Sequence, residues 1–99
     1  MKKEAHDLVL GAIPLGADHA ITLKTLSRRT GLNTRYLQTI IQDLRRDGEL
    51  IGSLSSGGIF RVDQENTDDL AHFNRFFIEQ RAQALERLKT LRCMKKALA

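Results

Sequence analysis

The sequence predicts a mainly helical fold with one small β-hairpin and a long C-terminal helix. Two short amphipathic segments meet at a glycine turn, a glycine-rich turn separates two short apolar runs, and the last third lacks both proline and glycine. With 99 residues, 41% of them hydrophobic, the chain is long enough for one domain with a modest core. We expect a domain over residues 1–66 and a long helix over residues 67–99.

The N-terminal segment predicts a helix followed by a loop. Apolar residues recur at helical spacing from Lys3 to about Ile13. Residues 14–19 contain the only proline of the chain and a glycine, which favour a loop.

Residues 22–44 predict two short helices joined by a tight turn. Thr22 suits the N-cap of the first helix, and Gly31 supplies the left-handed backbone that ends it. Asn33 or Thr34 then caps the second helix. Four apolar residues of that helix share one inward face: Leu37, Ile40, Ile41 and Leu44. This pattern is typical of a helix-turn-helix, which places its second helix in the DNA major groove.

The other face of the second helix is polar or basic and has no apolar residue. Its members are Thr34, Arg35, Gln38, Thr39, Gln42, Arg45 and Arg46. Over residues 24–46, six Lys or Arg residues against Asp43 give a net charge of +5. Positive charge here favours a polyanionic partner, because each neutralised phosphate releases counterions. The alternative is a solvated helical surface.

Residues 50–54 and 59–62 predict two strands around a turn at residues 55–58, where glycines can adopt positive φ. Phe60 and Val62 share one strand face and are expected to close the core. The hairpin carries a single cation, Arg61, so we expect little insertion into a DNA groove. A helix-turn-helix followed directly by a hairpin is the winged-helix pattern.

An unbroken helix is expected from Thr67 to about Met94, which is roughly 27 residues and about 40 Å at 1.5 Å per residue. Thr67 is expected to cap it. Asp68 and Asp69 lie in the first turn, where the helix dipole favours negative charge. The aromatic first half is dense enough to pack on the domain.

The second half of this helix has no apolar partner elsewhere in the chain, which predicts self-association. The expected dimer-interface residues are Phe76, Phe77, Ala84, Leu85, Leu88 and Leu91. Antiparallel packing onto the N-terminal helix of a second subunit is one arrangement. Gln80 and Arg87 interrupt a strict heptad, which disfavours a long regular coiled coil.

Residues 22–62 resemble the winged-helix DNA-binding superfamily, with a recognition helix that begins Asn33-Thr34-Arg35 and a helix end and wing at residues 46–51. The whole chain looks more like small winged-helix proteins of phages and prophages of Gram-positive bacteria. The shared features are a wing strand at residues 58–60, an acidic linker at 64–69 and a long basic helix through 77–91. The resemblance implies an edge strand at residues 20–22 that pairs with the wing, and a role in replication or transcription regulation.

We therefore expect a double-stranded DNA-binding homodimer. Four residues would contact base edges: Arg35, Gln38, Thr39 and Gln42. Six would hold phosphates: Lys24, Arg28, Arg29, Thr34, Arg45 and Arg46. Three more complete the expected DNA-binding set: Asn33, Tyr36 and Arg61.

No pattern predicts catalysis, a cofactor or a metal. The three histidines, His6, His19 and His72, lie in separate segments. Gly57-Gly58 lacks the Lys and Ser/Thr of a phosphate-binding loop. The single cysteine, Cys93, excludes an internal disulfide. We expect an incidental thiol in a reduced protein, with an intermolecular disulfide across a dimer as the alternative. With no long apolar run and no secretory signal, we expect a cytoplasmic protein without membrane contact.

Two other functions remain open. The C-terminal helix, with Phe76, Phe77, Leu85 and Leu88, could make the chain a protein-interaction module that binds a replication or transcription protein. A regulator that senses a small molecule is the third option, with the dimer interface as its only source of a pocket.

Overall fold

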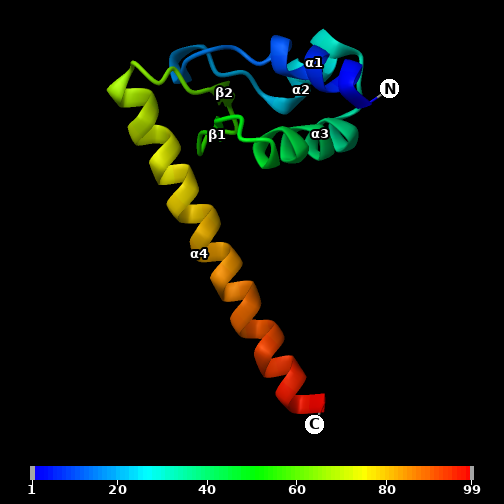
Figure 1. Cartoon of the computed structure of the whole chain (residues 1–99), viewed down its shortest axis with the longest axis vertical. Coiled ribbons are helices and arrows are strands. Elements are labelled where there is room, and N and C mark those ends of the chain that lie inside the picture. Colours follow the sequence, from blue (N-terminus) through cyan, green and yellow to red (C-terminus); the bar gives the residue numbers. More distant parts are fainter. Residues whose placement is uncertain (1, 99) are drawn as a thin grey trace.

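The computed structural model describes residues 2–98 and places the side chains of residues 3–98. The elements in chain order are α1 (Lys2–Ala12), the 3-10 turn η1 (Ala17–His19), α2 (Leu23–Thr30), α3 (Thr34–Arg46), β1 (Ile51–Ser53), β2 (Ile59–Arg61) and α4 (Thr67–Leu98). Figure 1 shows α1, α2, α3 and the hairpin gathered into a head, from which α4 extends away as a single rod. The expected fold class, mainly helical with a small hairpin and a long C-terminal helix, is confirmed.

The turn between α2 and α3 forms through the predicted caps. The Thr22 side chain accepts a hydrogen bond from the Thr25 N–H at 3.1 Å, and Gly31 ends α2 with φ of 74°. The Asn33 carboxamide oxygen accepts from the Tyr36 N–H at 2.8 Å, so Asn33 rather than Thr34 caps α3. The chain direction therefore changes between the helices because of local backbone and side-chain chemistry.

The main core lies between α1, α2, α3 and the hairpin. The four predicted apolar residues of α3 are buried, as are Val9, Ile13 and Leu26. Because α3 buries this whole face, its opposite face must point away from the head.

Within the head, the hairpin is attached to the other elements through β2. Its strands are antiparallel, with Gly52 opposite Phe60. A Cβ at Gly52 would lie 2.7 Å from the Phe60 ring, so the fully buried ring requires glycine there. The expected edge strand at residues 20–22 is reduced to one bridge, in which Ile21 and Ile59 exchange backbone hydrogen bonds of 3.1 and 2.7 Å.

The start of α4 differs from the prediction. Asn66, not Thr67, caps the helix, because its side-chain oxygen accepts from the N–H groups of Asp68 at 2.9 Å and Asp69 at 3.2 Å. The buried Asp69 carboxylate accepts from the backbone N–H of Ala17 at 3.0 Å and of Asp63 at 2.9 Å. Asp69 therefore ties the first turn of α4 to η1.

The rest of α4 is longer and more exposed than expected. The helix continues to Leu98, and only Phe73 and Phe76 are half-buried after its first turn. The side chain of every residue from 77 to 98 is exposed. Over residues 2–98, no helix combines the length and the apolar character needed to cross a bilayer.

Candidate nucleic-acid interface

The outer face of α3 is an exposed polar surface of the head. The exposed members of the predicted set on this helix are Thr34, Arg35, Tyr36, Gln38, Thr39, Gln42 and Arg46. In Figure 1, α3 lies along the side of the head that faces the space beside α4. The Arg46 guanidinium is 3.8 Å from the Asp43 carboxylate, but the side chain is 71% exposed. These side chains can all reach a partner that approaches α3 from outside.

Arg45 occupies a different position from the rest of the set. Its Nε donates a hydrogen bond to the Ile51 carbonyl at 2.8 Å, and its guanidinium lies 4.6 Å from the centre of the Phe76 ring. Burial desolvates the charge and lowers the pKa of Arg45 below its ordinary value. Arginine nevertheless stays protonated at neutral pH. Arg45 thus joins α3, β1 and α4.

Three other predicted DNA-binding residues use their side chains for hydrogen bonds within the chain: Asn33, Arg61 and Thr39, whose hydroxyl donates to the Arg35 carbonyl at 3.3 Å. The Arg61 Nε donates to the Ile13 carbonyl at 2.9 Å, which attaches β2 to the end of α1. The Asn33 side chain is the cap of α3. In contrast, Lys24, Arg28 and Arg29 are exposed on α2, with the two arginines in its last turn.

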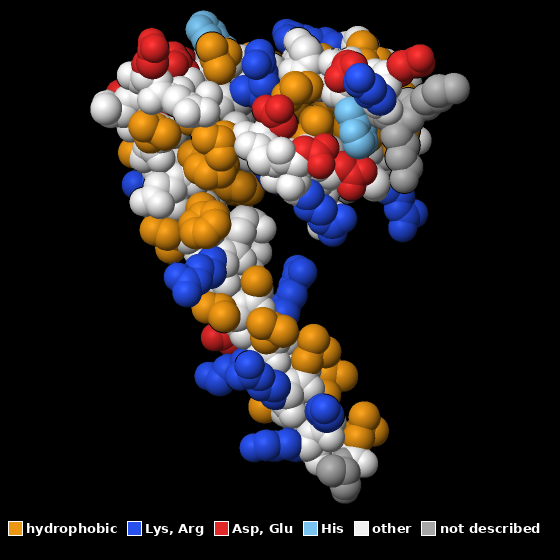
Figure 2. Space-filling model, in the orientation of Figure 1, with side chains coloured by type: hydrophobic (Ala, Val, Ile, Leu, Met, Phe, Trp, Pro, Cys, Tyr) orange, Lys and Arg blue, Asp and Glu red, His pale blue; other side chains and the backbone are white. Residues whose placement is uncertain are grey.

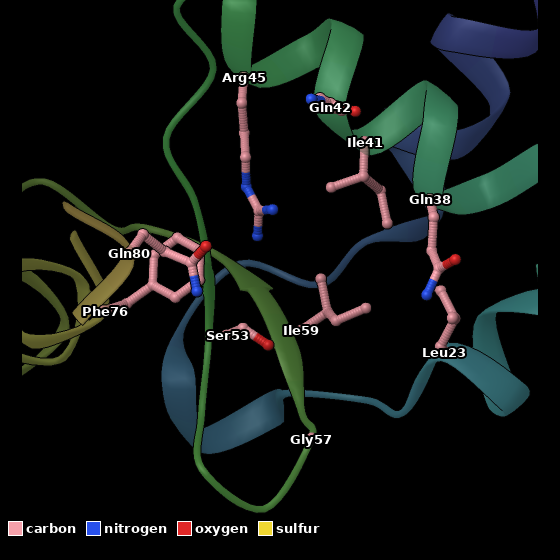
Figure 3. Close-up of a pocket in the computed structure, with 10 residues that line it drawn as sticks. All are labelled: Leu23, Gln38, Ile41, Gln42, Arg45, Ser53, Gly57, Ile59, Phe76 and Gln80. Atoms are coloured by element: carbon pink, nitrogen blue, oxygen red, sulfur yellow. The ribbon is translucent and has the colours of Figure 1, made fainter. Parts of the chain in front are cut away.

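A groove of about 630 Å³ runs beside α3, bounded by the hairpin and by α4. Its lining is Leu23, Gln38, Ile41, Gln42, Arg45, Ser53, Gly57, Ile59, Phe76 and Gln80. Figure 3 shows Arg45 pointing from α3 toward the Phe76 ring, while Gln38 points toward Leu23. The contribution of α4 to this groove was not expected from the sequence. The sequence offers one signal for this contact, the aromatic residue Phe76, but Phe76 lies far from Arg45 in the chain.

No protein-family model, curated protein or solved structure matches this chain. Function is therefore inferred from the placement of its own side chains. Among the described residues, no three His, Cys, Asp or Glu side chains gather as they would around a metal ion. His6 Nε2 and Asp43 Oδ2 lie 3.4 Å apart, and this contact joins α1 to α3.

The predicted dimer-interface residues lie on α4. Ala84 is exposed, and the larger residues Phe77, Leu85, Leu88 and Leu91 are between 49% and 57% exposed. Phe76 is instead half-buried beneath Arg45. Four further large apolar residues of α4 are exposed and lie outside the predicted set: Leu70, Ile78, Met94 and Leu98. Spacing gives a signal for three of them, because Ile78 lies seven residues before Leu85, and Met94 and Leu98 lie three and seven residues after Leu91.

Proposed function

We propose that this protein binds double-stranded DNA without catalysing a reaction, and that it does so as a homodimer. The observation that carries the proposal is the division of α3 into two faces. Its apolar face is buried against α1 and α2, whereas its outer face is exposed and contains only polar or charged side chains and Tyr36. The major groove is about 12 Å wide and admits one α-helix.

The side chains of the outer face suit the edges of bases. Arg35 can donate two hydrogen bonds to guanine, and Gln38 and Gln42 can each donate and accept with adenine. Arg46 and the exposed cations of α2, Lys24, Arg28 and Arg29, suit phosphates on either side. Arg45 is removed from this proposed phosphate set, because its guanidinium already joins α3 to β1 and α4.

The proposed dimer forms through α4. Leu85, Leu88 and Leu91 cover nothing in their own chain, and a contiguous exposed apolar stripe of this kind marks an interaction surface. A second copy of the same helix presents the same stripe. The proposed setting is the cytoplasm, in replication or transcription regulation of a phage or prophage.

Fluorescence anisotropy with a random-sequence duplex at two salt concentrations tests the function. We expect binding that weakens steeply with salt, since each phosphate contact releases counterions. The double variant Arg35→Ala/Arg46→Ala should lose most of this binding while its circular dichroism stays unchanged. Unaltered affinity in that variant would remove α3 from the interface.

The exposed stripe of α4 also supports a second function, a module that binds another protein. The two functions differ at low salt. A folded protein without affinity for any duplex at low salt would favour the interaction module, with α4 as its binding surface.

A further inference from the structure

One face of α4 continues the groove outward from α3. Phe76, Gln80, Gln83 and Arg87 follow one another at intervals of four, three and four residues, which places them on the same side of a helix. This side faces α3 at its start, because Arg45 of α3 lies over the Phe76 ring.

Gln80 connects two hollows along this side. It lines the groove beside α3, and it also lines a second hollow of about 380 Å³ with Gln83 and Arg87 and with the apolar residues Ala84, Leu88 and Leu91. We call Gln80, Gln83 and Arg87 the inner row of α4. The row leads from the groove at α3 to a guanidinium on the exposed part of α4.

The geometry beside α3 suits a wide, negatively charged partner. Arg87 is eleven residues beyond Phe76, or about 16 Å along the helix at 1.5 Å per residue. Figure 2 shows a hollow between the head and α4, with Lys or Arg side chains reaching into it from both sides. Residues 75–98 carry seven Lys or Arg against Glu79 and Glu86, a net charge of +5. Glu79 is three residues after Phe76 and four before Gln83, and Glu86 is three residues after Gln83, so both glutamates border the inner row and Arg87 is its one cation.

We propose, on the basis of the DNA-binding function above, that the sugar–phosphate backbone of the bound duplex lies against the inner row of α4. A duplex with α3 in its major groove presents phosphates on each side of that groove. The Arg87 guanidinium can donate two hydrogen bonds to one phosphate, and the Gln80 and Gln83 amides can each donate to neighbouring oxygens.

The inner row borders the proposed dimer stripe. Ala84, Leu88 and Leu91 line the second hollow together with the inner row, and Leu91 is four residues after Arg87 on the same side of the helix. Leu85, two residues before Arg87, projects from the opposite side, so a second copy would pack from the Leu85 side while the duplex lies against Arg87.

The test compares the salt dependence of duplex binding for Arg87→Ala and Lys89→Ala. Both variants lose one positive charge from an exposed position of α4, but Lys89 lies two residues on and faces the opposite side. We expect Arg87→Ala to weaken binding several-fold and to lower the slope of log K against log salt by about 0.9 for one lost phosphate contact. Lys89→Ala should retain the wild-type slope. Gln83→Glu, which adds a negative charge to the row, should weaken binding further than Gln83→Ala.

The outcomes separate this inference from the proposed function. Equal slopes for Arg87→Ala and wild type, or equal losses in Arg87→Ala and Lys89→Ala, overturn the contact with α4. If Arg46→Ala lowers the slope in the same experiment while Arg87→Ala does not, DNA binding by α3 stands and only the inner row is rejected. Absence of duplex binding by the wild-type protein rejects both.

Discussion

Arg45 and Arg46 are neighbours in sequence with opposite environments. The Arg45 side chain is held by the Ile51 carbonyl and the Phe76 ring, whereas the Arg46 side chain is 71% exposed. The two side chains project from α3 at different angles, and only the Arg45 position faces β1 and α4. Of these two arginines, Arg45 therefore makes a structural contact, and Arg46 is a candidate phosphate contact.

We expect Arg45→Ala to lower the free energy of unfolding by about 2 kcal/mol, because it removes a hydrogen bond from a charged donor and a cation–π contact. Arg46→Ala is the matched control and should change stability by less than about 0.5 kcal/mol. Urea denaturation measures both. Equal stabilities for the two variants would show that the Arg45 contacts contribute nothing to the fold.

Asp68 and Asp69 are also neighbours in sequence with different environments, because Asp69 is buried and Asp68 is exposed. Asp69→Ala would leave the buried N–H of Ala17 and the partly buried N–H of Asp63 without their acceptor, so we expect a loss of about 2–3 kcal/mol of stability. Asp68→Ala, at an exposed position, should lose far less. Thermal unfolding followed by circular dichroism distinguishes them. A similar melting temperature for both variants would contradict a specific role of Asp69 in attaching α4.

At the scale of the element, α3 depends on the difference between its two sides. The buried side is specified by apolar spacing and by the Asn33 cap, and the outer side follows as its complement. We propose that Gln38 on that outer side contacts a base edge and that Arg29, on α2, contacts the phosphate backbone.

We expect Gln38→Ala to relax the preference among duplex sequences, since an amide that pairs with adenine discriminates by about 1–3 kcal/mol. Arg29→Ala should weaken all duplexes alike and reduce the salt slope by about 1. Competition binding with a selected site and a scrambled site measures both effects. If Gln38→Ala weakened both sites equally, Gln38 would be a backbone contact.

At the scale of the whole molecule, the head contains most of the buried side chains, whereas most of α4 is exposed. The head has two clusters of buried side chains, centred on Leu37 and on Phe60. Beyond Phe76, α4 has no side chain that is even half-buried. A helix of this length with exposed leucines gains most of its stability from packing, which a second copy can supply.

We expect Leu88→Glu to convert a dimer into a monomer, because a charge in the apolar stripe would be buried at the interface without a partner. The fold of the head should remain, since Leu88 packs against no other element of its chain. Thr90→Glu, which adds the same charge on the opposite face, should stay dimeric. Light scattering gives the mass of each; a wild-type protein with the mass of one chain would exclude the dimer.

Most local features could be predicted because their causes lie within a few residues. Thr22, Gly31 and Asn33 act on backbone groups at most four residues away, and the apolar period of α3 specifies its buried face. The prediction failed at Thr67 for a comparable local reason, since Asn66 competes for the same N–H groups and its side-chain oxygen receives two of them.

The sequence by itself determined the order of the helices and the hairpin, the cap of α2, the buried face of α3 and the unpartnered stripe of α4. Only the tertiary structure decided that Arg45 and Arg61 bind backbone carbonyls, that Asp69 joins α4 to η1, and that α4 forms one side of the groove. These contacts join residues that are distant in the chain or that differ only in the angle at which they leave a helix. The charge and spacing of residues in a sequence do not show the angle at which a side chain leaves its helix toward a neighbouring element.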